Sequence, residues 1–373
     1  TIKVSIFGES HAPKIGCTID GLPAGFTVDL AALKTFLQKR SPSHPWDTPR
    51  KETDNPQFIS GISAEGILDG SPLTAELPNT NVRPQDYAAT KLIPRPGHAD
   101  FSAWSKWGDS YEQTGGGHFS ARLTAPLCIA GGIALQILRA QGITIAAHVL
   151  KIKDVSDTPL ELVDNLLEAN KLLAHQMDQL LQADPQALPF LDAQAVEKTR
   201  ALLTQLRSEK NTVGGVIECA ATGVPAGIGC PNFHGLENTI SAAVFGVPAV
   251  KAIEFGSGMN VANLLGSENN DAYEVRNGAV VPTTNHAGGI LGGISTGAPI
   301  WFRCALKPIS SIGLPQNSVN LQTMKSEQLV VQGRHDITAV LRAVPCIESA
   351  FALALLDTLY SWPSEQNGHD NDK

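Results

Sequence analysis

The sequence predicts a mixed fold of helices and strands that is rich in turns. Gly and Pro supply 34 and 24 of the 373 residues, and so many turn formers argue against a single helical bundle. Apolar residues recur at helical spacing over 159–182 and 193–209, whereas residues 213–222 alternate like a strand. A chain of this length forms one large domain or two ordinary ones and can bury a substantial core.

Individual elements follow from local patterns. Residues 3–7 are typical of a short strand, and Asp29 can cap a helix that runs to about Arg40. Residues 41–56, rich in Pro, Ser and Asp, are expected to form an ordered loop or a lid. A helix is expected to begin directly after Gly115-Gly116-Gly117 and to end at Gly142 as its C-cap.

The C-terminal half adds further helices and a polar end. Residues 236–245 and 338–359 have helical patterns, and the amphipathic stretches 159–182 and 193–209 are expected to pack on the body or on another subunit. Residues 361–373 are polar and are expected to be a disordered tail.

Charge and cysteine content restrict the functional classes. The net charge of −8 argues against a general nucleic-acid binder. The six cysteines show no CxxC pair and no zinc-ligand spacing, which predicts reduced thiols, no metal site and a cytoplasmic location. The N-terminus has no signal pattern and no apolar run is expected to reach membrane-spanning length, so no membrane association is predicted.

Three histidines stand in separate glycine-containing turns, each beside charged residues. They are His11 in Gly8–His11, His98 in Arg95–Asp100, and His335 in Gly333–Asp336. Turns on a rigid scaffold are where catalytic groups tend to lie. Three such turns far apart in the chain predict one site assembled from distant segments.

Two glycine-dense runs suggest ligand contacts, and each has a plain alternative. Gly115–Arg122 could bind phosphate at a helix N-terminus or serve as a hinge without a ligand. Asn285–Gly297 could let a planar ligand lie against the backbone or mark a tight strand crossing. Neither has the spacing of a dinucleotide or P-loop motif. Within the second run, Gly293–Gly297 matches GxSxG, but a proline and a strand-like stretch follow it, which argues against a serine hydrolase.

Basic residues gather in the same loops, which indicates a substrate with several negative charges. Arginine suits carboxylate and phosphate because its planar fork binds them in a bidentate manner. For any one of these residues, ordinary surface charge is the alternative. They are Arg40, Arg50, Lys51, Arg95, Arg122, Lys307, Arg334 and Arg342.

Taken in order and spacing, the three histidine turns and the two glycine-dense runs resemble the signature segments of the chorismate synthase family. Thr48–Glu52 and Val247–Lys251 add weaker matches, and the similarity covers roughly residues 1–360. The chain is identified as a divergent bacterial-type member. The resemblance implies an α+β fold with a helical layer between two antiparallel β-sheets, one catalytic domain over 1–360, and a homotetramer.

The resemblance also implies an activity. Family members convert 5-enolpyruvylshikimate-3-phosphate to chorismate by anti-1,4-elimination of phosphate, the last step of the shikimate pathway, and require reduced FMN although the reaction is redox-neutral. An external flavin reductase is expected, with NADPH as an indirect reductant. The alternative is a flavin- or anion-binding homologue without turnover.

Residue roles carry over position by position. Arg40, Arg50, Arg122 and Arg342 are expected to bind the anionic substrate. The segments similar to the family's flavin-contacting ones are His118, Phe119 and Ser120, then Pro248 and Ala249, then Gly292, then Lys307, Pro308, Ile309, Ser310 and Ser311, and Arg334.

Three residues are assigned to the chemistry. His11 is expected to protonate the leaving phosphate, because a histidine beside a dianion donates as imidazolium near neutral pH. His98 is expected to meet the flavin, and Asp336 to help remove the ring proton. His335 is expected to be structural.

The chain departs from the family pattern at a few positions. His118 and Phe119 replace the usual arginine and serine after the triple glycine, Ala12 and Ile337 replace a glycine and a proline, and Ser41 stands where many members have arginine. A neutral imidazole at residue 118 would hold the FMN phosphate more weakly than arginine, and more so above about pH 7. The catalytic trio is retained, which predicts an active member.

Overall fold

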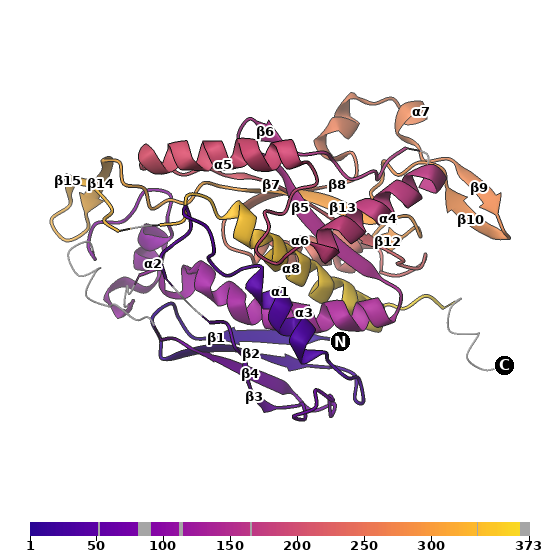
Figure 1. Ribbon diagram of the computed structural model, residues 1–373, viewed down its shortest axis with the longest axis horizontal. Coiled ribbons are helices and arrows are strands. Elements are labelled where there is room, and N and C mark those ends of the chain that lie inside the picture. The colour runs from indigo at the N-terminus through magenta and orange to yellow at the C-terminus, as the bar shows by residue number, and fades with distance from the viewer. Residues whose placement is uncertain (51–52, 81–90, 112–114, 165, 334, 366–373) are drawn as a thin grey trace.

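The computed structural model describes residues 1–50, 53–80, 91–111, 115–164, 166–333 and 335–365. Its main body has a layer of helices between two antiparallel sheets (Figure 1). This confirms the predicted α+β class and layer order. The division into a domain over 1–360 and a tail over 361–373 stays a prediction, and residues 366–373 lie outside the described part.

The first sheet has four strands in the order β1-β2-β4-β3. The strands are β1 (Lys3–Phe7), β2 (Lys14–Asp20), β3 (Gln57–Ser60) and β4 (Leu73–Pro78). Strand β1 has the predicted bounds. The buried side chains of β2 and β4 face the helices, and the turn between β1 and β2 carries His11 to one end of the sheet.

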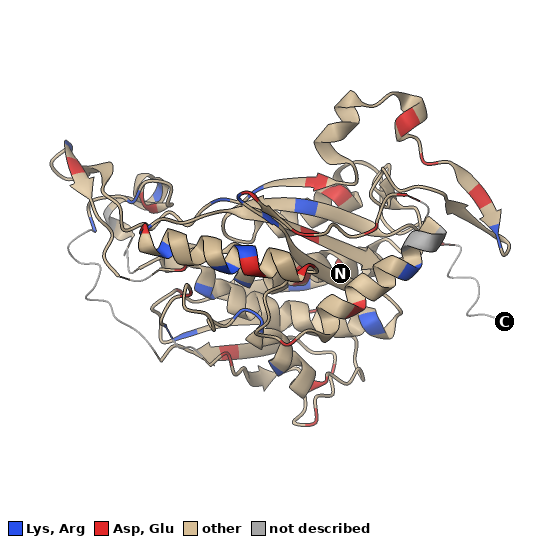
Figure 2. Cartoon of the chain, turned by 45° about the horizontal axis from the view of Figure 1, so that its top comes forward, with Lys and Arg blue, Asp and Glu red and all other residues tan. Residues whose placement is uncertain are grey.

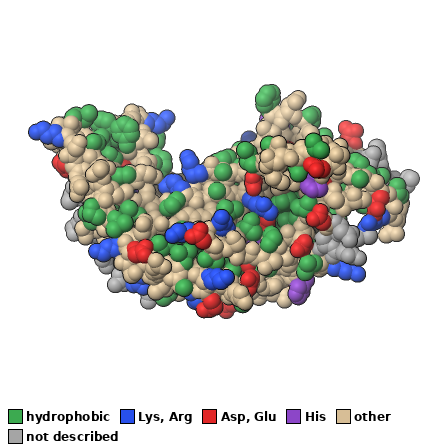
Figure 3. Space-filling view, turned by 90° about the horizontal axis from the view of Figure 1, so that it is seen from above, with side chains coloured by type: hydrophobic (Ala, Val, Ile, Leu, Met, Phe, Trp, Pro, Cys, Tyr) green, Lys and Arg blue, Asp and Glu red, His purple; other side chains and the backbone are tan. Residues whose placement is uncertain are grey.

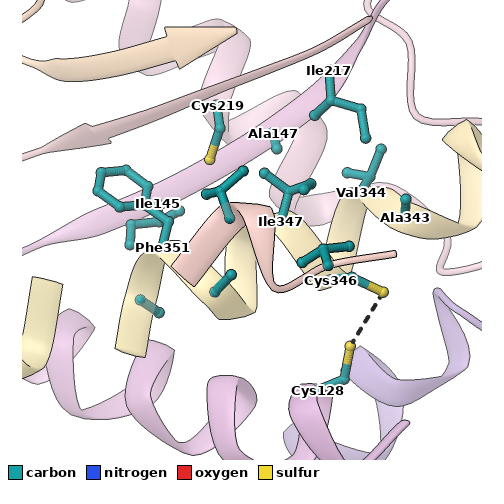
Figure 4. Close-up of a cluster of buried hydrophobic side chains, with 14 of the residues drawn as sticks. Cys128, Ile145, Ala147, Ile217, Cys219, Ala343, Val344, Cys346, Ile347 and Phe351 are labelled. Atoms are coloured by element: carbon teal, nitrogen blue, oxygen red, sulfur yellow. Dashed lines mark hydrogen bonds between the residues drawn. The ribbon is translucent and has the colours of Figure 1, made fainter. Parts of the chain in front are cut away.

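The helical layer contains α1 (Leu30–Gln38), α3 (Thr124–Ala140), α6 (Leu236–Phe245) and α8 (Val340–Ser361). Asp29 caps α1 as predicted, its carboxylate accepting a hydrogen bond from Ala32 N. Helices α3 and α8 form the centre of the core, where Gly131 lies so close to Ser349 that a Cβ would clash. Cys128 and Cys346 meet there with sulfur atoms 3.8 Å apart (Figure 4).

The second sheet has five strands in the order β6-β5-β7-β13-β8. They are β5 (Thr144–Ile152), β6 (Val155–Ser156), β7 (Gly215–Thr222), β8 (Val250–Phe255) and β13 (Ile300–Leu306). One face packs on α8. The other face carries Ala146, Ala220 and Trp301, which form a second hydrophobic cluster with α4 (Leu166–Gln182). Helix α4 contacts β5 and helix α5 (Ala193–Ser208) contacts β6, so both amphipathic stretches pack on the body (Figure 1).

Shorter elements decorate the two ends of this body. Helix α2 (Asp100–Trp107) and the hairpin of β14 (Gln316–Asn320) and β15 (Lys325–Leu329) lie at one end, and the hairpin of β9 (Tyr273–Arg276) and β10 (Ala279–Pro282) lies at the other (Figure 1). The rest are α7 (Gly266–Asn269), β11 (Ile290–Leu291), β12 (Ile294–Ser295), and the 3-10 turns 108–110, 117–119, 121–123, 232–234 and 258–263.

Several predicted boundaries were wrong. The helix expected directly after the triple glycine begins at Thr124, because two 3-10 turns, Gly117–Phe119 and Ala121–Leu123, come first. The helix expected from residue 159 begins at Leu166; the loop before it instead contributes Leu160 and Leu162 to the cluster under α4.

The prediction that no apolar run reaches membrane-spanning length was also wrong, judged by length and composition. One stretch, Ala121–Ala140, is long and apolar enough to cross a membrane. It is 72% buried in the core, as expected of the central helix of a globular body, so it is weak evidence for a membrane span.

Candidate functional site

The first histidine turn lies against the triple-glycine segment. Ser10 N donates to Gly117 O at 3.2 Å, and Glu9 Oε1 pairs with His118 Nε2 at 2.9 Å. The turn is fastened from the other side by Asn79, whose Nδ2 donates to Ala12 O at 2.7 Å. His11 is thereby held beside the segment predicted to bind a phosphate.

Asn79 also connects this turn to a buried cluster of opposite charges. Arg122 Nε donates to Asn79 Oδ1 at 3.2 Å. The carboxylate of Asp54 accepts from Arg122 Nη1 and from Arg40 Nη1, each at 2.5 Å. All three charged side chains are almost completely buried. One carboxylate shared by two guanidinium groups leaves an excess positive charge, which suits an anion.

The charges of this cluster alter its acid–base behaviour. Burial alone would raise the pKa of Asp54, but the positive charges of Arg40 and Arg122 outweigh burial and lower it. The carboxylate is therefore ionised at neutral pH and holds both arginines in place.

The third histidine turn is tied to the loop that follows α1. Asp336 Oδ1 accepts from Thr48 N at 2.7 Å, and Oδ2 accepts from Arg342 Nη1 at 2.8 Å. Arg342 Nε donates to Arg40 O at 2.6 Å. Arg342, on the first turn of α8, thus orients the carboxylate of Asp336 and fixes the backbone at Arg40.

The second histidine turn is built around another buried carboxylate. Asp100 Oδ1 lies 2.6 Å from His98 Nδ1, and Asp100 Oδ2 accepts from Arg95 Nε at 2.7 Å. Arg95 also donates to Gly115 O at 3.1 Å and to Ser311 Oγ at 3.3 Å. One arginine therefore joins this turn to the triple-glycine segment and to the predicted flavin segment over 307–311.

The 307–311 segment lies beside a strained residue. Lys307 N donates to Ala249 O at 2.9 Å, and Ala249 has a φ of +75°, which is rare for a residue with a Cβ. Such strain persists only where the surroundings enforce it and is common at ligand sites. Burial, together with the neighbouring charge of Lys251, lowers the pKa of Lys307.

His335 occupies a position consistent with its expected structural role. Its Nε2 lies 3.2 Å from Gln332 O, inside its own turn. Burial, and then the charge of nearby Arg95, lowers the pKa of His335.

Some of the predicted site residues, together with the residues bonded to them, thus lie in one cluster of loops at the end of the molecule where α3 and α8 begin (Figure 1). Hydrogen bonds or close packing connect the members of that cluster. They are Glu9, Ser10, Arg40, Thr48, Arg50, Asp54, Asn79, Arg95, His98, Asp100, Gly115, Arg122, Ala249, Lys307, Ser311, Asp336 and Arg342.

Other predicted residues are less closely connected. Phe119 packs against Trp107 and Tyr111, with ring centroids 6.3 Å away from each, in an aromatic cluster beside the loops. Gly292 lies in the turn between β11 and β12, where the adjacent Gly293 packs on Cys230 and Gly235. Arg334 and Lys51 lie outside the described residues.

Sequence reasoning missed Asp54 and gave Asp100 no role. Asp100 was visible as the last residue of the Arg95–Asp100 segment, but Asp54 is one of several acidic residues in a polar loop and carries no local signal. The strand expected after the GxSxG match is present as β13. Ser295 of that match is buried, and its hydroxyl donates to Pro225 O at 2.5 Å.

The surface carries charges of both signs. Helix α5 shows basic and acidic side chains on its visible face (Figure 2), as an ordinary solvated helix does. Seen from above, the molecule is hollowed between its two ends, with Lys and Arg side chains along the hollow (Figure 3).

The family model described as Chorismate synthase matches residues 2–360 of the chain. A curated protein named chorismate synthase, from Lancefieldella parvula, is 88% identical over 372 residues, covering 100% of this chain and 98% of the relative. Archaeal proteins of the same name are more distant: that of Aeropyrum pernix is 37% identical, covering 96% of this chain and 90% of the relative.

The fold has a solved counterpart. A crystal structure of chorismate synthase superposes with a TM-score of 0.72 and 21% identity, covering 99% of this chain and 95% of the other. At that identity the likeness supports the arrangement of helices and sheets alone.

Proposed function

The chain belongs to the chorismate synthase family, and we propose that the loop cluster around His11, His98 and Asp336 is its active site. The chain is a carbon–oxygen lyase of the shikimate pathway that eliminates phosphate from 5-enolpyruvylshikimate-3-phosphate to give chorismate. In that reaction the C–O bond to phosphate and a ring C–H bond break, and a new C=C bond forms. The site must therefore stabilise a leaving dianion and accept one proton.

One observation carries this assignment: Asn79 joins the His11 turn to the arginine pair. Its amide nitrogen donates to Ala12 O, while its amide oxygen accepts from Arg122. A proton donor and two guanidinium groups are thereby held in one place. Departure of phosphate needs both neutralisation and protonation, so we assign Arg40 and Arg122 to the substrate phosphate and His11 to the proton. Arg50, bonded to Ser10 O at 3.1 Å, extends the same basic surface.

The donor set also fits reduced FMN. Burial and then the charge of Lys251 lower the pKa of Lys307, and a phosphate bound there would offset that repulsion. Ser120 caps the 3-10 turn before α3 by accepting from Arg122 N at 3.2 Å, and the strained Ala249 accepts from Lys307 N at the start of the 307–311 segment. We therefore propose that FMN is held by residues 118–120, 248–249, 292, 307–311 and 334.

When bound, reduced FMN supplies an electron-rich ring that can pass charge to the substrate transiently and recover it. The protein's own residues do the rest. We propose that His98 exchanges a proton with the flavin and that Asp336, oriented by Arg342 and Thr48 N, helps remove the ring proton. Because the elimination is redox-neutral, FMN has to be reduced beforehand, which an external flavin reductase would do with NADPH as the indirect source.

Assembly and location complete the proposal. We propose a homotetramer in the cytoplasm, as the family resemblance and the six free cysteines suggest.

The experiment is an anaerobic assay of chorismate formation from the enolpyruvyl substrate with chemically reduced FMN. Product formation is expected. Flavin binding without product would instead support the alternative, a binding protein that has lost turnover.

A further inference from the structure

The carboxylate of Asp100 is the hub of the second histidine turn. Each of its two oxygens has two partners, and only Oδ1 faces the histidine. Oδ2 accepts from Arg95 N at 3.0 Å and from Arg95 Nε at 2.7 Å, whereas Oδ1 faces His98 Nδ1 at 2.6 Å and Arg95 Nη2 at 2.9 Å. The side chain of Asp100 is 2% exposed, against 16% for His98. A buried carboxylate thus backs a histidine whose ring reaches the surface of the site.

Asp100 is ionised. Burial would raise its pKa, but the hydrogen bonds and charges of Arg95 and His98 outweigh burial and hold the pKa well below its ordinary value. An ionised carboxylate accepts hydrogen bonds only. The short contact with His98 Nδ1 therefore requires a hydrogen on that nitrogen.

Arg95 does not compete for the imidazole. Its Nη2 lies 3.3 Å from both ring nitrogens of His98. The same Nη2 makes shorter bonds to Asp100 Oδ1, at 2.9 Å, and to Gly115 O, at 3.1 Å. A guanidinium NH2 group has two hydrogens, and these two bonds use both.

We propose that Asp100 is a positioning residue that fixes His98 as the tautomer protonated on Nδ1, leaving Nε2 as the nitrogen that exchanges a proton with the bound ligands. Arg95 holds Asp100 in this role and ties it to the triple-glycine segment. The inference rests on the proposed function, because it gives His98 of that site its working nitrogen. It assigns no proton transfer to Asp100 itself, which stays ionised.

Substitution by asparagine should reverse the tautomer. An asparagine offers one oxygen and one NH2 group where Asp100 offers two acceptors. The oxygen should face Arg95 N and Arg95 Nε, since both are donors, which leaves the NH2 group facing His98 Nδ1. That nitrogen must then accept, so the hydrogen moves to Nε2.

The chain contains a matched control. Asp271 Oδ1 lies 3.0 Å from His286 Nδ1 and also accepts from His286 N at 2.8 Å. This second His–Asp pair lies in the segment around β9 and β10, and its histidine is 20% exposed, much like His98. Asp271→Asn makes the same carboxylate-to-amide change beside a histidine outside the loop cluster, and it should not reduce turnover.

The test uses the full chain labelled with 15N in its histidines. The ring nitrogen signals of His98, identified by their loss in His98→Ala, are recorded for wild type, Asp100→Asn and Asp271→Asn without flavin or substrate. Turnover, KM and FMN affinity are then measured for the same proteins. We expect His98 protonated on Nδ1 in wild type and on Nε2 in Asp100→Asn, with kcat lowered about 100-fold or more and FMN affinity retained.

Three results would overturn the proposal: a wild-type His98 protonated on Nε2 alone, an unchanged tautomer with reduced kcat, or a changed tautomer with wild-type kcat. If Asp100→Asn does not fold, Asp100→Glu replaces it in the test. This variant should keep His98 protonated on Nδ1 and should retain more activity than any neutral replacement. The tautomer is read without catalysis. Failure of the proposed function would appear separately, as a wild-type protein that makes no chorismate.

Discussion

Two histidines in this chain, His98 and His148, lie beside carboxylates that an arginine also contacts, yet their burial and bonding differ. His98 has one carboxylate partner, Asp100, and part of its ring is exposed in the loop cluster. His148, on β5, is fully buried between Asp157, at 2.7 Å from Nδ1, and Glu218, at 3.1 Å from Nε2. Arg303 completes that second network by donating to Glu218 Oε2 at 3.0 Å.

The difference separates structural from chemical use of the same residue types. Both ring nitrogens of His148 are committed, and the carboxylates around it also accept from Leu160 N, Leu191 N and Asp192 N, which fastens two loops to the outer face of the second sheet. His98 is held by one nitrogen. A histidine with a carboxylate partner therefore indicates a reactive site only when its other nitrogen can reach a ligand.

The largest effect is expected from removing the proton-handling residues of the loop cluster. His11→Ala and Asp336→Ala should each lower kcat by about 100- to 10,000-fold, the usual worth of general acid–base catalysis. FMN affinity should be largely retained. Anaerobic turnover at saturating reduced flavin measures kcat, and flavin titration measures FMN affinity. Near wild-type rates in both variants would mean that the roles are assigned to the wrong residues.

The opposite result is expected at His148. His148→Leu should cost about 3–5 kcal/mol of unfolding free energy, because two buried carboxylates lose their partner, while kcat per folded molecule stays near wild type. Urea unfolding and turnover at low temperature check both quantities. His148→Gln, which can still donate and accept, should cost less. A large loss of kcat in folded His148→Leu would show that His148 is not purely structural.

The same network should depend on pH. Burial would lower the pKa of His148, but its bonds to Asp157 and Glu218 outweigh burial and raise it, and the pKa of Glu218 is lowered. The histidine's contribution is therefore fully present below its unfolded pKa of about 6.5 and is lost as pH rises through the raised value. The contribution of Glu218 to stability is present above its unfolded pKa of about 4.3 and is lost as the pH falls through its lowered folded value. The stability gap between wild type and His148→Leu should be widest between these limits.

Local patterns predicted those parts of the fold that local forces determine. The strand Lys3–Phe7, the cap Asp29 and the helix Leu236–Phe245 follow from alternation, capping chemistry and helical spacing. The start of α3 did not, since the residues after the triple glycine form 3-10 turns that close against the His11 turn. Glycine indicates freedom of the backbone, and tertiary contacts choose among the conformations it allows.

In the site, the residue types were predictable but their pairings were not. Turns with histidine, glycine and arginine indicated an anionic ligand. Nothing local indicated that Asp54 binds Arg40 and Arg122, residues that lie 14 and 68 positions away. Likewise, sequence reasoning expected Arg342 to contact the substrate, which stays a prediction, and it gave no sign of the bonds to Asp336 and Arg40 O through which Arg342 holds the loops together.

A smaller effect is expected from that arginine. In Arg342→Lys, a single ammonium group cannot reproduce the fork that reaches Asp336 and Arg40 O together. The displaced carboxylate should lower kcat by about 10- to 100-fold, with KM less affected. Steady-state kinetics at saturating flavin measure this split. An increase in KM with unchanged kcat would show instead that Arg342 binds substrate, as the sequence alone suggested.

The smallest effect is expected at His118, where the chain departs from its family. The imidazole is 56% exposed and pairs with Glu9, so solvent screens it strongly. His118→Arg places a permanent charge near the proposed FMN phosphate and should tighten FMN about two- to fivefold, the range of exposed ion pairs. The gain should be larger at alkaline than at mildly acidic pH, because guanidinium keeps its charge throughout. His175→Arg, which adds the same charge to exposed α4, is the control. Equal tightening of FMN binding in both variants would reveal a general charge effect. If His118→Arg leaves the FMN affinity unchanged, residue 118 faces Glu9 and not the phosphate.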